Sequence, residues 1–93
     1  MEPGRLKLAV LASGRGSNFL ALQQAIQKGE LNADICLLIS DNEGAAALQK
    51  AMDAGIEALL VNPRVYKNRD EYETEIVSLL TRRNIDMVVL AGY

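Results

Sequence analysis

Residues 6–26 read LKLAVLASGRGSNFLALQQAI, and this stretch decides the fold class. It begins with a short apolar run over 6–12, which predicts a β-strand, and it continues through a loop that holds two glycines. The spacing of Phe19, Leu22 and Ile26 then predicts an amphipathic helix, because these residues fall on one face. A strand, a glycine loop and a helix in this order are typical of the first unit of a parallel α/β sheet.

The remainder of the chain repeats this alternation of apolar runs and helical stretches. We expect the first helix over 18–28, with Asn18 as its N-cap and Gly29 as its stop. Further strands are expected over 33–40, 56–61 and 87–91, and further helices over 44–54 and 70–83. The pattern indicates βαβ units, so the predicted class is α/β with a parallel sheet of four strands in β-α-β-α-β-α-β order.

Finer features of two segments follow from the same patterns. The run over 33–40 has no alternation, which suits a strand buried on both faces. The helix over 70–83 carries one apolar stripe that is expected to pack in the core: Tyr72, Ile76, Leu79 and Leu80. Asn84 is expected to end this helix in a left-handed conformation.

The composition is that of an ordinary globular domain. The chain has 93 residues and a formal net charge of −2, so a single domain over 1–93 is expected. The slightly acidic balance argues against a general nucleic-acid binder, and no apolar run is long enough to predict a membrane span. Cys36 has apolar flanks and is expected to be a buried thiol in a reducing compartment, which favours a cytoplasmic location.

The absence of histidine limits the chemistry that these residues can perform. The commonest general base is missing, and a lone cysteine without histidine predicts neither a zinc cluster nor a Cys–His nucleophile. We therefore expect no metal site. Any chemistry of this chain alone depends on carboxylates, lysine, arginine, tyrosine and backbone groups.

The loop SGRGSN at 13–18 is the segment that most strongly indicates a ligand. Its two glycines allow positive φ angles that direct successive N–H groups toward one point, and the following helix adds free N–H groups and its positive dipole end. Ser17 and Asn18 add side-chain donors. We interpret the loop as a phosphate site at the carboxyl end of a strand; a plain glycine turn without a ligand is the alternative.

The kind of phosphate compound is narrowed by two comparisons with known motifs. No Gly-Lys-Ser/Thr follows the loop, so it is not the phosphate loop of ATPases. Gly14 and Gly16 match half of the dinucleotide fingerprint, and Asp41 could serve a ribose, but Phe19 occupies the third glycine position. A phosphomonoester on a small substrate fits better. A non-catalytic phosphate- or nucleotide-binding module and an NAD-dependent oxidoreductase domain remain as alternatives.

Weaker candidates lie near the same edge of the predicted sheet. Arg69 precedes the acidic start of a helix, and Asp41 and Asn42 follow the second strand. Gly92 follows the fourth strand, where a missing side chain would allow close approach of a substrate. Each also has an ordinary explanation, as a solvated charge or as turn chemistry.

Four segments together resemble the glycinamide ribonucleotide formyltransferases. They are LAVLASGRGSNFLALQQAI, SDNEGAAALQKAMDAGI, YKNRDEYETEI and the final IDMVVLAGY, and they match in order and spacing over nearly the whole chain. The resemblance implies a Rossmann-like three-layer sandwich. It also implies one step of purine (IMP) biosynthesis, in which a formyl group passes from the cosubstrate 10-formyltetrahydrofolate to the amino group of glycinamide ribonucleotide.

The resemblance also implies roles for individual residues. The glycine loop of this family holds the 5′-phosphate of the substrate, and that role transfers to Gly16, Ser17 and Asn18. The arginine before the third helix lines the folate site, which is Arg69 here, and the glycine after the fourth strand lies against the substrate, which is Gly92 here.

The chain departs from the family in length. The catalytic Asn, His and Asp of the family lie downstream of the fourth strand, so the chain resembles a truncated N-terminal half that contains no catalytic residue. We expect it to be inactive in formyl transfer by itself. We also expect the outer edge of the fourth strand to be uncovered, which favours self-association.

Overall fold

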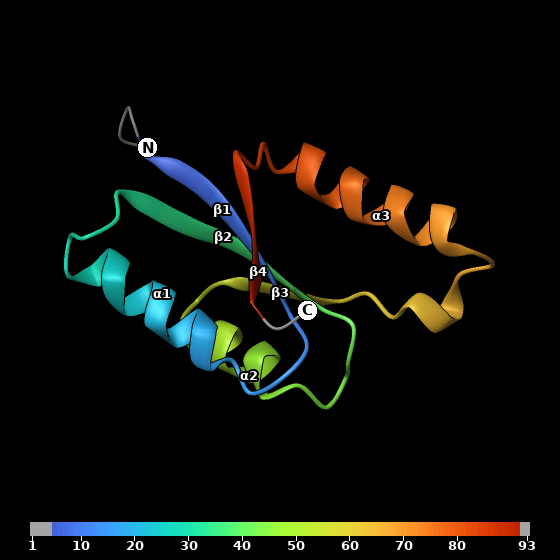
Figure 1. Cartoon of the computed structure of the whole chain (residues 1–93), viewed down its shortest axis with the longest axis horizontal. Coiled ribbons are helices and arrows are strands. Elements are labelled where there is room, and N and C mark those ends of the chain that lie inside the picture. Colours follow the sequence, from blue (N-terminus) through green and yellow to red (C-terminus); the bar gives the residue numbers. More distant parts are fainter. Residues whose placement is uncertain (1–4, 92–93) are drawn as a thin grey trace.

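The computed structural model of the chain describes residues 5–91 (Figure 1). The strands are β1 (Leu6–Ala12), β2 (Ala33–Ser40), β3 (Glu57–Leu60) and β4 (Met87–Ala91). The helices are α1 (Ser17–Gln27), α2 (Ala46–Asp53) and α3 (Arg69–Arg82), with a short 3-10 helix at Pro63–Val65. The predicted order of strands and helices is therefore confirmed.

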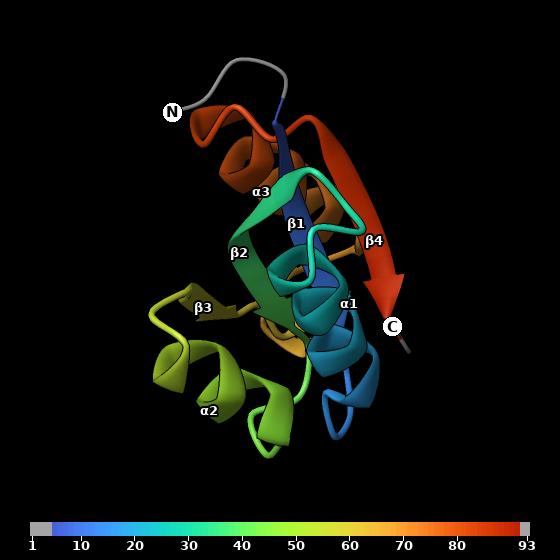
Figure 2. The same cartoon turned by 90° about the vertical axis from the view of Figure 1, so that its left-hand side faces the viewer.

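The strands form one parallel sheet between two layers of helices. β1 pairs with β2 and with β4, and β2 pairs with β3, so the order across the sheet is β3-β2-β1-β4. Helices α1 and α2 cover one face and α3 covers the other, as two perpendicular views show (Figures 1 and 2). The parallel α/β sheet that the sequence pattern predicts is confirmed, and so is the Rossmann-like three-layer sandwich that the family resemblance implies.

Alternate residues of β1 enter the two halves of the core. Val10 and Ala12 pack with Phe19 and the small residues of α2, whereas Ala9 and Leu11 pack against α3. Because both faces of β1 are covered over residues 8–12, this part of the strand has no polar side, which explains its continuous apolar run. The stripe predicted for the last helix is also confirmed, since its members contribute to the α3 half of the core: Tyr72, Ile76, Leu79 and Leu80.

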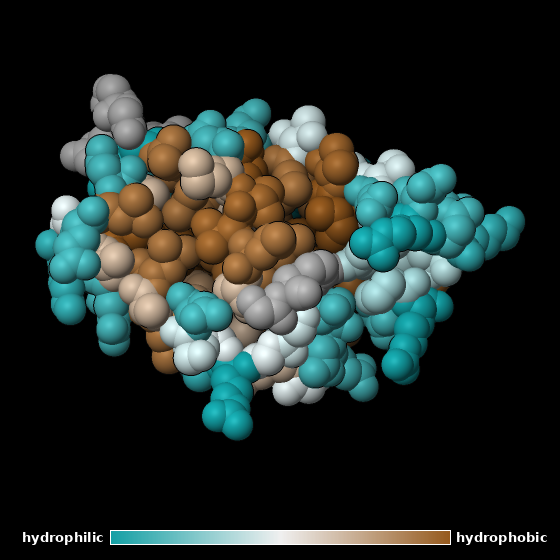
Figure 3. Space-filling model, viewed as in Figure 1, coloured by the Kyte–Doolittle hydropathy of each residue, from teal (hydrophilic) through white to brown (hydrophobic). Residues whose placement is uncertain are grey.

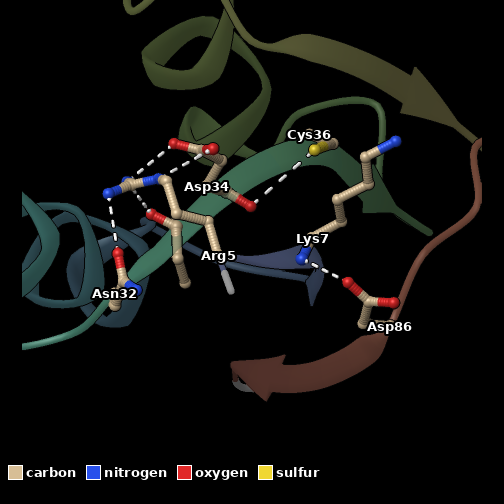
Figure 4. A network of polar contacts seen from close by, with 7 residues as sticks. Arg5, Lys7, Asn32, Asp34, Cys36 and Asp86 are labelled. Atoms are coloured by element: carbon tan, nitrogen blue, oxygen red, sulfur yellow. Dashed lines mark hydrogen bonds and ion pairs between the residues drawn. The ribbon is translucent and has the colours of Figure 1, made fainter. Parts of the chain in front are cut away.

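A bulge in β2 changes the surroundings of the cysteine. Leu8 pairs with Ile35 but Ala9 pairs with Leu37, so Cys36 is an extra residue in the ladder. Its side chain is half-buried, and the sulfur lies 3.8 Å from the carbonyl oxygen of Asp34 (Figure 4). The prediction of a buried thiol was therefore wrong, because the bulge takes Cys36 out of the regular alternation of the strand.

Polar contacts join the strands at their amino ends (Figure 4). The Arg5 guanidinium donates to both carboxylate oxygens of Asp34, at 3.1 and 2.8 Å, and to the side-chain oxygen of Asn32 at 3.0 Å. These hydrogen bonds lower the pKa of Asp34. The Lys7 backbone N–H donates to Asp86 at 2.8 Å, which joins β1 to the residue before β4. This network lies at the opposite end of the sheet from the glycine loop.

A second ion pair fastens the end of α3 to β3. The Arg83 guanidinium contacts both carboxylate oxygens of Glu57, at 2.7 and 2.6 Å, and it also donates to the carbonyl oxygen of Leu79 at 2.9 Å. The contact lowers the pKa of Glu57 and raises that of Arg83. Asn84 follows with φ +55°, the left-handed helix end that the sequence predicts.

The β4 strand lies at one edge of the sheet. Among residues 5–91 it pairs with β1 alone, and its outer edge carries no further strand. Met87, Val88 and Leu90 are exposed there, and Leu90 keeps 70% of its accessible surface. Figure 3 shows apolar side chains gathered over β4 between α1 and α3. No helix within the described part of the chain is both long and apolar enough to cross a membrane.

Candidate functional site

The glycine loop follows β1 at the carboxyl edge of the sheet and leads directly into α1. Gly16 is the residue before the helix and has φ +83°. A Cβ atom at this position would lie 3.0 Å from the Ala47 Cα and 3.1 Å from its Cβ. Gly16 therefore meets two demands at once, because it adopts a left-handed conformation and lets α2 approach the loop closely.

Only one of the two loop glycines has the conformation that the sequence predicts. Gly14 does not have a positive φ, and a Cβ atom there would meet nothing within 4 Å. The expectation of positive φ at both positions is thus correct for Gly16 and wrong for Gly14. The reason is that a single left-handed residue suffices to turn the chain from β1 into α1.

The first turn of α1 presents free hydrogen-bond donors. The helix begins at Ser17, one residue earlier than predicted, and no side chain caps it. The prediction of Asn18 as N-cap was wrong, because the Gly16 carbonyl already accepts the first helical hydrogen bond, from Leu20, at 2.9 Å. Ser17 and Asn18 are exposed, so their side chains are available to a ligand together with the first N–H groups of the helix.

Contacts from the neighbouring β2–α2 segment hold the loop in place. The Ala47 N–H donates to the Gly14 carbonyl at 3.3 Å, and the Lys50 ammonium donates to the Arg15 carbonyl at 2.6 Å. The Asn42 side chain donates to the Ser13 carbonyl at 3.4 Å. A fixed loop of N–H donors at a helix N-terminus, with two cationic side chains beside it, is suited to an oxyanion such as a phosphate.

A polar cleft of about 530 Å³ lies between the loop after β2 and the start of α3. Asp41 and Tyr72 line it, and one carboxylate oxygen of Asp41 and the Tyr72 hydroxyl are buried without a hydrogen-bond partner in the described residues. Burial raises the pKa of Tyr72, and the nearby Asp41 charge raises it further. Arg69 also lines the cleft, and it donates to Glu73 at 3.0 Å while remaining 85% exposed.

The structure brings together some of the predicted site residues and separates others. Gly16, Ser17 and Asn18 are consecutive at the start of α1, whereas Arg69 begins α3 on the other face of the sheet (Figure 1). The loop after β2 lies between them, since Asn42 contacts the glycine loop and its neighbour Asp41 lines the Arg69 cleft. Gly92 lies outside the described residues.

A model of the formyl transferase family matches residues 6–93. The chain belongs to the formyl transferase family. The human trifunctional purine biosynthetic protein adenosine-3 is 39% identical over 92 residues, which are 99% of this chain and 9% of the human protein. The Arabidopsis thaliana protein named phosphoribosylglycinamide formyltransferase, chloroplastic, is 35% identical over 99% of this chain and 32% of its own length.

Solved structures of the family share the fold of this formyl transferase chain. Glycinamide ribonucleotide transformylase 1 from Geobacillus kaustophilus is 38% identical, with a TM-score of 0.91 over 96% of this chain and 47% of that chain. The enzyme of the same name from Symbiobacterium toebii is 30% identical, with a TM-score of 0.92 over 99% of this chain and 43% of that chain. The chain thus spans about half the length, or less, of the relatives that it matches.

Two residues near the candidate site of this formyl transferase chain were missed by sequence reasoning. Lys50 contacts a loop that precedes it by 35 positions, and nothing in its local sequence distinguishes it from other helix-surface lysines. Tyr72 was predicted to pack, which is correct for its ring, but the residue also lines the cleft beside Asp41, where the buried hydroxyl has no hydrogen-bond partner within residues 5–91. The helical spacing predicts which face of α3 carries Tyr72, but it does not predict what surrounds the hydroxyl group.

Proposed function

We propose that this chain provides the substrate-phosphate half of a phosphoribosylglycinamide formyltransferase. The reaction is formyl transfer from 10-formyltetrahydrofolate to the amino group of glycinamide ribonucleotide, in the formation of IMP. The observation that carries the proposal is the loop around Gly16, which presents free helix N–H groups in a chain that matches glycinamide ribonucleotide transformylases over nearly all its length.

In this proposal the phosphate of the substrate lies at the start of α1. The N–H groups of Gly16 and Ser17 and the side chains of Ser17 and Asn18 donate to its oxygens, and the helix dipole favours the negative charge. Arg15, which is exposed beside them, adds positive potential. Gly92 would lie against the remainder of the substrate.

The folate cosubstrate would lie toward Arg69. The cleft there fits a group that carries a carboxylate, because the Arg69 guanidinium is largely exposed and only its Nε atom donates to Glu73. The folate supplies the formyl group. No metal is part of the proposal, and no cluster of metal-binding side chains occurs within residues 5–91.

We also propose that the 93 residues do not catalyse formyl transfer by themselves. Attack of the amine on the formyl group forms a tetrahedral intermediate that needs preorganised donors and a proton acceptor. The family places an Asn, a His and an Asp in these roles, and the sequence contains no histidine. A formyl-transfer assay should give the rate of buffer alone, and clear turnover would contradict the proposal.

Calorimetric titration tests the phosphate site. Glycinamide ribonucleotide should bind at least tenfold more tightly than its dephosphorylated riboside, and Asn18→Ala should weaken binding by about tenfold. Gln24→Ala, an exposed polar change further along α1, is the matched control and should leave affinity unchanged. Equal affinity for the two ligands, or for wild type and Asn18→Ala, would contradict the phosphate assignment.

The same titration separates this function from the alternative of a general phosphate- or nucleotide-binding module. The glycine loop contacts only a phosphate, so a module that uses nothing else would bind AMP and glycinamide ribonucleotide equally. A formyltransferase half should prefer the ribonucleotide. The cytoplasmic location stays a prediction, and the Arabidopsis relative is named chloroplastic.

Self-association through β4 is a further part of the proposal. Among residues 5–91 no strand pairs with the outer edge of β4, and within residues 87–91 no charged side chain or proline protects it. A second copy could add its β4 to this edge and cover Val88 and Leu90, which are exposed.

A further inference from the structure

Three successive carbonyl groups of the glycine loop are occupied by donors. The Gly14 carbonyl accepts from the Ala47 N–H, and the Gly16 carbonyl accepts from the Leu20 N–H. Between them, the Arg15 carbonyl accepts from the Lys50 ammonium at 2.6 Å. Lys50 is therefore the only side chain in the described residues that fixes the middle peptide of the loop.

The geometry of the peptide bond converts these contacts into a direction for the N–H groups. In a trans peptide the C=O and the following N–H point in opposite directions, and residues 5–91 contain no cis peptide. Because the carbonyls of Gly14 and Arg15 both point at α2, the N–H groups of Arg15 and Gly16 point away from it. Within the described residues neither N–H donates to another protein group.

The aliphatic part of the Lys50 side chain packs against the loop, which supports the contact of its ammonium with the Arg15 carbonyl. The residue is half-buried, and its Cδ atom lies 3.3 Å from the position that a Cβ on Gly16 would take. The stem thus packs against the loop while the ammonium reaches over Gly16 to the preceding carbonyl. A shorter or neutral side chain would leave the Arg15–Gly16 peptide free to rotate.

We propose that Lys50 is a positioning residue for the phosphate site. By binding the Arg15 carbonyl, its ammonium turns the Gly16 N–H toward the anion and keeps it there before the ligand arrives. The inference rests on the phosphate site of the proposed function, and it adds that α2 orients this site through one side chain. Lys50 acts through the backbone and does not itself contact the ligand.

The test compares three variants by amide NMR, with inorganic phosphate as the probe. Lys50→Met removes the donor but keeps the length of the stem, Lys50→Arg keeps a donor, and Lys28→Met removes an exposed lysine elsewhere on the surface. We expect Lys50→Met to weaken phosphate binding by about tenfold, the order expected for loss of a hydrogen bond to a charged group. Lys50→Arg and Lys28→Met should bind within about threefold of wild type.

Two further measurements distinguish a positioning role of Lys50 from a general effect of its charge on phosphate binding. The carbonyl ¹³C shift of Arg15 should move in Lys50→Met without ligand and stay near the wild-type value in Lys50→Arg. The loss of affinity in Lys50→Met should persist at high salt, because an interaction between distant exposed charges is screened there whereas a hydrogen bond is not.

The outcomes distinguish this inference from the function on which it rests. If phosphate moves no amide signal of Gly16, Ser17 or Asn18 in the wild type, the phosphate site itself is wrong. If wild type and Lys50→Met bind phosphate equally, the site stands and the positioning role is refuted. A loss in Lys50→Met that vanishes at high salt would also refute it.

Discussion

Replacing Gly16 by alanine places one methyl group where the structure leaves no room for it. The new Cβ would lie 3.0 Å from the Ala47 Cα atom and 3.3 Å from the Lys50 Cδ atom. The backbone at this position also has φ +83°, a conformation that alanine rarely adopts. The substitution therefore disturbs both the turn from β1 into α1 and the contact between the loop and α2.

The expected loss of stability follows from these two effects. A left-handed alanine costs about 1–2 kcal/mol, and forcing a methyl group against a packed backbone costs about 1–3 kcal/mol. Alanine also restricts the unfolded chain more than glycine does, and this effect offsets about 0.4–1 kcal/mol of the loss. Gly16→Ala should thus lower the free energy of unfolding by about 1–4.5 kcal/mol, which a domain of this size with a stability of roughly 5–10 kcal/mol can survive.

Urea unfolding followed by circular dichroism measures this loss. The midpoint should fall by roughly 0.5–4.5 M if the slope is about 1–2 kcal/mol per M. Gly14→Ala is the control in the same loop, because nothing lies within 4 Å of its new methyl group and its φ is not positive. That variant should change stability by less than about 1 kcal/mol. Equal midpoints for the two variants would refute the role assigned to Gly16.

Three further changes test the packing and the surface of the chain. Glu57→Gln should cost about 0.5–1 kcal/mol at neutral pH, since Glu57 and Arg83 are partly exposed. The pKa of Glu57 is lowered in the folded state, so its contribution is complete above the unfolded pKa of about 4.3 and is lost as pH falls through the folded value. Wild type and variant should therefore converge in acid, and a constant difference in urea midpoint from neutral to acid pH would contradict the ion pair. Tyr72→Phe removes a buried hydroxyl without a partner in the described residues, so the melting temperature should stay equal or rise; a clear fall would show that the hydroxyl is hydrogen-bonded. Leu90→Lys should reduce the concentration-dependent mass in light scattering, because a charge on an edge strand opposes strand pairing; a monomeric wild type at high concentration would reject self-association.

The sequence was sufficient for the fold because each element has its own periodicity. The apolar run over 33–40 correctly predicts a strand covered on both faces, and the spacing of Tyr72 and Ile76 correctly predicts the face of α3. Which residue ends a helix was also predictable at Gly29 and Asn84, where the chain adopts positive φ. Strands, helix faces and helix ends depend on residues that are close together in the sequence, so local sequence patterns can predict them.

The features that the sequence did not predict depend on contacts between distant residues. Cys36 is half-buried because of a bulge in the pairing of β2 with β1, and no local pattern specifies that register. The start of α1 at Ser17 follows from the conformation of Gly16, which is in turn required by the approach of α2. The contact of Lys50 with the Arg15 carbonyl requires α2 to lie beside the glycine loop, and nothing in the local sequence of α2 specifies that placement.

A crystal structure of the chain with glycinamide ribonucleotide shows directly whether the glycine loop holds the phosphate of the substrate. We expect the phosphate to lie at the start of α1, within hydrogen-bond distance of the Gly16 and Ser17 N–H groups and of the Asn18 side chain. A phosphate bound elsewhere, for example beside Arg69 in the cleft between Asp41 and Tyr72, would contradict it.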